Sequence, residues 1–106
     1  MGVEATPPIT LVVTGRITRA DVPGLCAALD RLLAAPERAG APVECDLAGV
    51  VRPGLTVVEA LARLSLTVRR AGRGPLRLRG TPPELRTLLD LVGLADLAGV
   101  TDAPSP

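Results

Sequence analysis

Residues 43–68 read VECDLAGVVRPGLTVVEALARLSLTV and contain the clearest secondary-structure pattern of the chain. It begins with Val43–Leu47, a short β-rich run that predicts a strand. Residues 48–54 contain two glycines and a proline, a composition typical of a connection. Beyond them, side chains recur at the spacing of one helix side, at Val57, Val58, Leu61, Leu64, Ser65 and Val68. The stretch therefore predicts a strand that leads directly into an amphipathic helix.

The same pattern occurs on the N-terminal side of this stretch. Ile9–Thr14 is a second β-rich run, closed by Gly15. A helix is predicted over residues 22–35, with Asp21 as its N-cap and Pro23 in its first turn. Its apolar side follows the helical period at Val22, Leu25, Cys26, Leu29, Leu32 and Leu33.

The C-terminal side repeats the pattern once more. Residues 75–79 alternate between apolar and basic side chains, which predicts a strand with one buried face. Thr81-Pro82-Pro83-Glu84 has the composition of a capping box, with Thr81 as N-cap and Glu84 at the third helical position. The helix that it starts ends at Gly93 and has an apolar face formed by Leu85, Leu88, Leu89 and Val92. Strands that alternate with helices indicate one α/β domain in which the three β-rich runs share a sheet.

The boundaries of this domain follow from length and local composition. A chain of 106 residues has the length of one domain. Two prolines interrupt pairing near the start, so residues 1–8 form an N-terminal segment or at most a short edge strand. Residues 9–98 are expected to fold, with a further helical turn over 94–97, and residues 99–106 to form a flexible tail. The start of the chain has no signal-peptide pattern and no apolar run approaches about 20 residues, so we expect a cytoplasmic protein without membrane insertion.

The amino-acid composition excludes most catalytic and metal chemistry. The chain contains no His, Lys, Phe, Tyr or Trp. Without His neither a Ser-His-Asp triad nor a His-ligated zinc site can be built, and without Lys no Schiff base can form. We therefore predict a protein that is not an enzyme, with no catalytic residue, no metal site and no cofactor. Cys26 and Cys45 are expected to be unlinked, buried thiols.

The charge distribution gives little support to a nucleic-acid partner. The formal net charge is only +1, although residues 52–86 contain eight Arg against two Glu. Six of these basic side chains could form a strip for nucleic acid: Arg63, Arg69, Arg70, Arg73, Arg77 and Arg79. The chain has no aromatic side chain on which bases could stack, which favours a solvated basic face instead.

Three strings, in order along the chain, resemble the STAS family, the domain of bacterial anti-sigma factor antagonists and of sulfate-transporter tails. Residues 81–97, TPPELRTLLDLVGLADL, resemble the closing helix of the family and its GL-x-x-L ending. Leu11–Ile17 is similar to the family's second strand, and Cys45–Val50 is similar to its DLSGV string. The resemblance covers nearly all of residues 9–97. It implies a STAS-like α/β fold with a central mixed sheet of about four strands and three to four surrounding helices.

The resemblance also implies a functional loop, in which this chain departs from the family pattern. After DLSGV, the family usually has Asp-Ser-Ser-Gly at a helix start, where a Ser receives phosphate from an anti-sigma kinase. Counting from Asp46, the acceptor position falls on Leu55 and the neighbouring hydroxyl position on Thr56. Thr56 is thus the one possible phospho-acceptor, and the alternative is an unmodified Thr at a helix start. Thr18 occupies the position of the family's Asp in the first strand-helix loop. These departures imply that the phosphorylation switch is degenerate or lost.

From the resemblance we expect a non-enzymatic module that binds a regulatory protein partner, and the candidate partner is an anti-sigma factor. The protein would then act in sigma factor regulation, and so in transcription regulation, in a bacterium. The partner-binding residues expected around the helix start and its loops are Thr18, Arg52, Gly54, Leu55 and Thr56. Leu55 and Leu66 lie off the apolar stripe of their helix, so we expect both to be exposed. Two alternatives are a constitutive subunit of a larger complex and a STAS domain that binds a nucleotide or other small ligand. A second copy of the chain is a further candidate partner.

Overall fold

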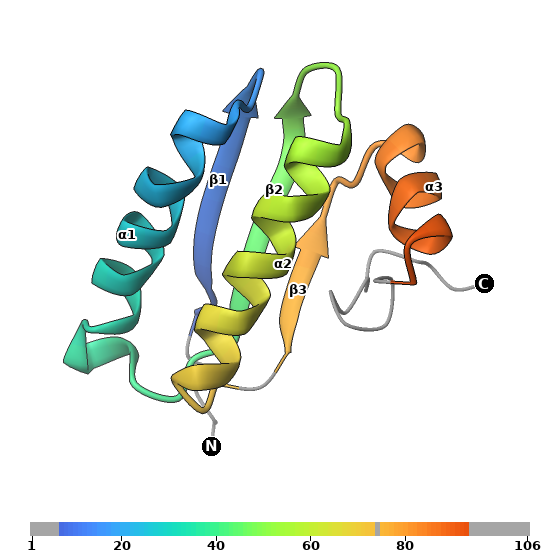
Figure 1. Ribbon diagram of the computed structural model, residues 1–106. Coiled ribbons are helices and arrows are strands. Elements are labelled where there is room, and N and C mark those ends of the chain that lie inside the picture. The colour runs from blue at the N-terminus through green and yellow to red at the C-terminus, as the bar shows by residue number, and fades with distance from the viewer. Residues whose placement is uncertain (1–6, 74, 94–106) are drawn as a thin grey trace.

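The computed structural model describes residues 7–73 and 75–93. Strands and helices alternate along the chain, as the sequence predicts (Figure 1). In order, the elements are β1 (Ile9–Gly15), the 3-10 turn η1 (Arg19–Asp21), α1 (Val22–Leu33), the 3-10 turn η2 (Pro36–Arg38), β2 (Val43–Val50), α2 (Leu55–Arg70), β3 (Leu76–Arg79) and α3 (Pro83–Leu91). The predicted elements agree with these bounds to within a few residues.

The three strands form one sheet in the order β1-β2-β3, and both pairs of neighbours are parallel. Thr10 lies opposite Glu44, which lies opposite Arg77. Each parallel pair is joined by a helical crossover, and α1 and α2 pack side by side on the same face of the sheet (Figure 1). The expected four-stranded mixed sheet is not confirmed: the described residues form three parallel strands. Residues 1–6, which hold most of the candidate edge strand, lie outside the described residues.

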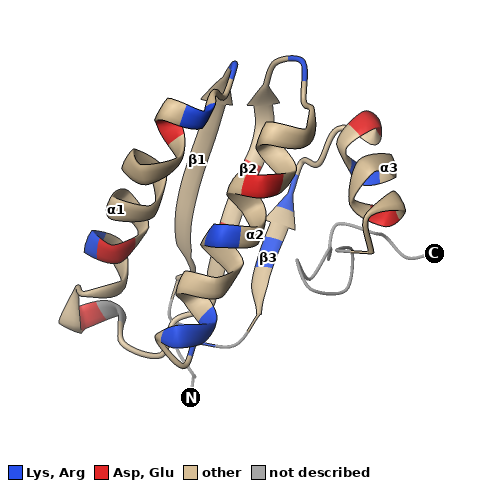
Figure 2. Cartoon of the chain, in the orientation of Figure 1, with Lys and Arg blue, Asp and Glu red and all other residues tan. Residues whose placement is uncertain are grey.

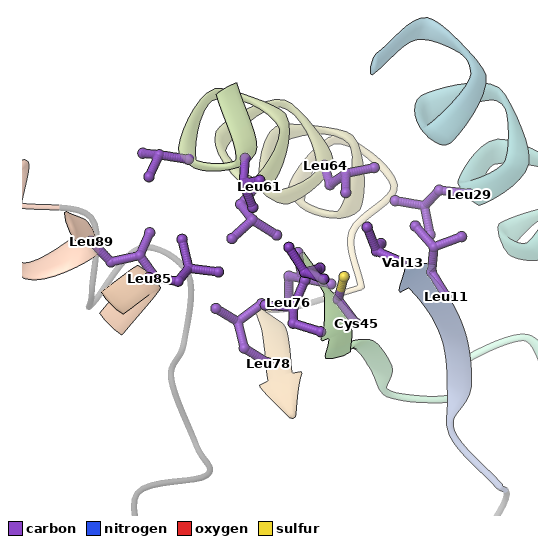
Figure 3. Close-up of a cluster of buried hydrophobic side chains, with 14 of the residues drawn as sticks. Leu11, Val13, Leu29, Cys45, Leu61, Leu64, Leu76, Leu78, Leu85 and Leu89 are labelled. Carbon is purple, nitrogen blue, oxygen red and sulfur yellow. The ribbon is translucent and has the colours of Figure 1, made fainter. Parts of the chain in front are cut away.

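The core lies between the sheet and the helices and is built from aliphatic side chains. Alternate strand residues point toward the helices and are buried, namely Ile9, Leu11, Val13, Val43, Cys45, Leu47, Leu76 and Leu78. The six predicted stripe residues of α2 are all buried. Leu61 and Leu64 of this stripe lie in the core with Leu85 and Leu89 of α3 (Figure 3). On the opposite face of the sheet the side chains are exposed or half-buried, and no helix within residues 7–73 and 75–93 covers them.

The predicted capping box of the last helix is wrong by one residue. The N-cap is Pro82, whose carbonyl accepts the first helical hydrogen bond from Arg86 N at 3.0 Å. Pro82 has an extended backbone, with φ −60° and ψ 148°, because the proline that follows it disfavours the helical region. Thr81 therefore precedes the N-cap instead of occupying it. The helix ends before Gly93, as predicted, where φ is +74°.

Some predicted core positions are less buried than expected. Leu32, at the margin of the α1 stripe, is exposed, and so is Val92, which lies just past the last residue of α3. Both cysteines are unlinked, as predicted, but only Cys45 is buried and Cys26 is half-buried. The predicted turn over 94–97 and the tail over 99–106 lie outside the described residues.

Candidate functional site

The site begins where the carboxyl ends of β1 and β2 meet at one edge of the sheet. Because the two strands are parallel, Gly15 at the end of β1 lies opposite Val50 at the end of β2. The pairing extends one residue further, since Val51 N donates to Gly15 O at 2.9 Å. The loop that carries Thr18 and the loop that carries Arg52 therefore leave the sheet side by side (Figure 1).

Thr18 is an exposed residue held in a tight local turn. Its backbone N–H donates to Asp21 Oδ2 at 2.8 Å, and its hydroxyl donates to the same oxygen at 3.1 Å. In return, Asp21 N donates to the Thr18 carbonyl at 3.0 Å. Asp21 precedes α1 as predicted, but its carboxylate caps the η1 turn and makes no cap bond to α1. The Thr-x-x-Asp spacing was the signal for this reciprocal capping, which sequence reasoning missed.

Arg52 is the one non-glycine residue of the described chain with a positive φ, at 53°. This left-handed conformation costs an L-residue roughly 1–2 kcal/mol. Pro53 makes this conformation of Arg52 still less favourable, because a residue before proline favours extended backbone. Sparsely populated conformations of this kind persist where the surrounding structure holds them, and they concentrate at functional sites. The Arg52 side chain is exposed at the tip of its loop.

Gly54, Leu55 and Thr56 form the start of α2. Gly54 is the N-cap, and its carbonyl accepts bonds from Val57 N at 3.0 Å and Val58 N at 3.2 Å. Leu55 is 66% exposed, which confirms the sequence expectation, whereas Thr56 is half-buried. Val51 in the preceding loop is also exposed, at 52%. Two apolar side chains thus flank Arg52 on the loop and the helix start.

A shallow pocket of about 250 Å³ lies between η1 with the start of α1 and the second and third turns of α2. Its lining comes from both elements, with Arg19, Val22 and Pro23 on one side and Glu59 and Arg63 on the other. Arg19 Nε lies 3.8 Å from Glu59 Oε1, and the two side chains are 84% and 45% exposed. Sequence reasoning missed Arg19 and Glu59, because their pairing joins residues that lie far apart in the chain. The structure thus brings the two predicted loops together through backbone pairing, and the ion pair joins η1 to the second turn of α2.

The basic strip considered from the sequence is divided between two sides of the molecule. Arg63, Arg69 and Arg70 belong to α2, whereas Arg77 and Arg79 alternate with the core leucines of β3 and so lie on the opposite face of the sheet. Figure 2 shows basic positions on both α2 and β3. Arg79 Nη1 donates to Glu44 Oε1 at 3.2 Å on that face. The six arginines therefore do not form one continuous surface.

The chemistry open to the described residues is limited. They contain no group of three His, Cys, Asp or Glu side chains placed to hold a metal ion. The thiol of Cys45 is a poor nucleophile, because burial, helped by the charge of Asp46, raises its pKa to about 12. No helix in residues 7–73 and 75–93 has both the length and the apolar character that crossing a bilayer requires. What the site offers is an exposed surface of mixed apolar and basic character.

A family model described as "Mlab, STAS domain" matches residues 2–100. No curated protein matches the chain. The matched range includes all eight elements of the structure and both loops of the candidate site.

Proposed function

This chain belongs to the STAS domain family, and on that premise we propose that it is a non-enzymatic cytoplasmic module that binds a regulatory protein partner. The partner docks on the edge of the domain where β1 and β2 end. The residues that carry the contact are Thr18, Arg52, Gly54, Leu55 and Thr56. An anti-sigma factor is the partner class, so that the protein acts in sigma factor regulation.

The observation that carries this proposal is the exposure of Leu55 and Val51 beside Arg52. Large apolar side chains on the surface of a domain mark contact sites when they gather together. Arginine beside apolar side chains is the composition found at the centres of protein interfaces. The positive φ of Arg52 supports the same conclusion, because a conformation that costs stability persists where it serves a function.

The usual phosphorylation switch does not operate in this proposal. Leu55 stands at the acceptor position and has no hydroxyl, and Thr56 is half-buried at the first turn of α2. A half-buried hydroxyl is less accessible to a kinase than an exposed one. A constitutive subunit is the second candidate, and the exposed Leu55 favours it specifically, since permanent interfaces are more apolar than transient ones.

The experiment compares capture of partners from the native cell extract by the full tagged chain and by two variants. Leu55→Asp places a charge in the centre of the surface. Leu91→Asp is the matched control, because Leu91 is 76% exposed on α3, away from the β1–β2 edge. We expect mass spectrometry to identify a protein that the wild type and Leu91→Asp capture and that Leu55→Asp loses. That protein is then purified and its affinity for each variant measured by calorimetry.

A third variant, Arg52→Gly, separates a contact from a structural role. Glycine adopts a positive φ without steric cost, so the variant should unfold at the same or a higher denaturant concentration than the wild type. Its affinity for the purified partner should nevertheless fall, because the guanidinium is lost. Equal capture by the wild type and by a folded Leu55→Asp variant would show that the partner docks elsewhere. If Thr56 carries a phosphate and its removal abolishes the interaction, a phosphorylation switch does operate and this part of the proposal is wrong.

A further inference from the structure

The side of α2 that faces away from the sheet carries a stripe of exposed residues, with the half-buried Ala62 among them. Its residues are spaced three, four or seven apart, so they stack along one side of the helix. We call this stripe the α2 outer face; it consists of Leu55, Glu59, Ala62, Arg63, Leu66, Arg69 and Arg70. Leu66 is 47% exposed, and it lies three turns from Leu55, about 16 Å along the helix axis. The face thus extends from the proposed docking edge along the whole helix.

The α2 outer face is basic, and its charge is not compensated within the described residues. Its one carboxylate, Glu59, lies beside Arg19. Arg63, Arg69 and Arg70 are exposed, and none of the ion pairs among residues 7–73 and 75–93 includes them. Arg73, close by in sequence, behaves differently, because its guanidinium donates to Ala41 O at 3.1 Å and to Leu33 O at 3.0 Å. Arg63, Arg69 and Arg70, the outer arginines, therefore have no internal role of the kind that Arg73 has within the described residues.

We infer that the α2 outer face is a second part of the docking surface and that it takes an acidic, amphipathic segment of the protein partner. This inference rests on the proposed function, and it adds the chemistry of the partner. Apolar side chains of the segment contact Leu55 and Leu66, while its carboxylates lie against the outer arginines. Charge complementarity of this kind selects a partner and speeds the encounter. Arginine is suited to this role because its planar guanidinium binds a carboxylate through two hydrogen bonds.

Two other occupants fit the face less well. A second copy of the chain, packed α2 against α2, would bring three uncompensated arginines toward three more, which disfavours the pairing. An anionic membrane would match the charge, but the face has only two exposed leucines and no Trp or Phe to enter the lipid. The experiment below includes both occupants as outcomes.

The probe is a designed 18-residue amphipathic helical peptide with Leu on one side and Glu on the other, with a matched peptide in which Lys replaces every Glu. Each is titrated into the 15N-labelled full chain at low salt and followed by NMR. We expect the Glu peptide to shift the amide signals of α2 and to bind about tenfold more tightly than the Lys peptide. The difference should shrink as salt is raised, because ions screen exposed charges.

A triple variant, Arg63→Glu with Arg69→Glu and Arg70→Glu, should reverse the preference between the two peptides. Arg77→Glu, on the open face of the sheet, is the control for a charge reversal away from α2 and should retain the preference for the Glu peptide. The inference fails if the two peptides bind the wild type equally, if the Glu peptide does not bind, or if the triple variant keeps the wild-type preference. It also fails if sedimentation shows a dimer that the triple variant disrupts, or if the wild type and not the triple variant binds phosphatidylglycerol vesicles.

The capture experiment separates this inference from the proposed function. If the partner lost by Leu55→Asp is still bound with wild-type affinity by a folded triple variant, the docking edge is correct and the acidic partner chemistry is wrong. If Leu55→Asp retains every partner, the proposed docking edge itself is wrong, whatever the peptides do. If both variants lower the affinity for the same protein, the two surfaces act together.

Discussion

The two sides of α2 contain the same kinds of residue in opposite environments. On the inner side, Leu61 and Leu64 are 2% and 1% exposed and pack in the core (Figure 3). On the outer side, Leu55 and Leu66 are 66% and 47% exposed. The difference shows that position on the helix, not residue type, separates the leucines that stabilise the fold from those that are available to a partner.

A second comparison concerns the charges on the two exposed surfaces. On the open face of the sheet, Glu44 lies 3.2 Å from Arg79, and Asp46 Oδ1 accepts a bond from Ala48 N at 3.0 Å. Those carboxylates have partners within the chain, whereas the arginines of the α2 outer face are in no ion pair within the described residues. Arg77 on the sheet face is also in no ion pair within the described residues, so the feature that supports our proposal for the α2 outer face is the gathering of three such arginines on one helix side.

The largest expected effect tests the comparison of the two sides of α2 directly. Leu61→Asp places an unpaired charge among aliphatic side chains and should cost more than about 4 kcal/mol, enough to unfold the domain. Leu55→Asp, on the outer side of the same helix, should change the free energy of unfolding by less than about 0.5 kcal/mol. Urea unfolding followed by circular dichroism measures both. Equal destabilisation by the two variants would place Leu55 in the core and remove it from the docking surface.

A smaller effect on stability is expected from a change in pH, because the thiol of Cys45, in the sheet beneath α2, titrates at high pH. Folding raises the pKa of Cys45 from 9.0 to about 12, so the unfolded chain loses this proton first as pH rises. Stability is therefore complete below pH 9 and falls between pH 9 and 12, by about 2 kcal/mol at pH 10.5. The chain has no Lys, Tyr or His whose titration would obscure the effect.

The measurement is urea unfolding between pH 8 and 10.5 in a Cys26→Ser background. Cys45→Val is the control, because it keeps an apolar side chain at this position and removes the titrating group. Its stability should stay flat over this range. An alkaline loss of the same size in Cys45→Val would assign the effect to another group.

The smallest expected effect on stability distinguishes arginines that stabilise the fold from arginines that do not. Arg73→Ala removes two bonds to backbone carbonyls, one of them at the end of α1, and should cost about 1 kcal/mol. Arg70→Ala, at the last residue of α2, should cost no more than about 0.5 kcal/mol. Thermal unfolding of the two variants side by side measures the difference. A cost for Arg70→Ala as large as that for Arg73→Ala would show that the outer arginines have a structural role.

The local features of this fold could be predicted from the sequence, because each depends on neighbours in the chain. The apolar stripe of α2 follows from the helical period, and all of its predicted members are buried. The alternation in β3 and the stop at Gly93 are equally local. The predicted N-cap of α3 was wrong by one residue, because the effect of Pro83 on the backbone of Pro82 outweighed the capping pattern.

The candidate site was predictable in part. The exposure of Leu55 and Leu66 followed from their positions off the stripe. The positive φ of Arg52 was not predictable, because arginine before proline locally favours extended backbone, and the loop is held instead by the strands and helix on either side of it. The role of Asp21 also differed from its local pattern, since its carboxylate bonds to Thr18 and not to the first turn of α1.

Periodicity and composition are properties of the chain alone, and they sufficed to predict which segments are strands and helices, which side of each is buried, and that no His- or Lys-based chemistry is available. Three features could be known only from the folded chain: β1 and β2 end side by side, Arg19 lies against Glu59, and Arg73 bonds to the backbone of the chain while Arg63 does not. These outcomes depend on contacts between residues that are distant in the chain, and the energy of such a contact is defined only once packing of the core has brought the two residues together.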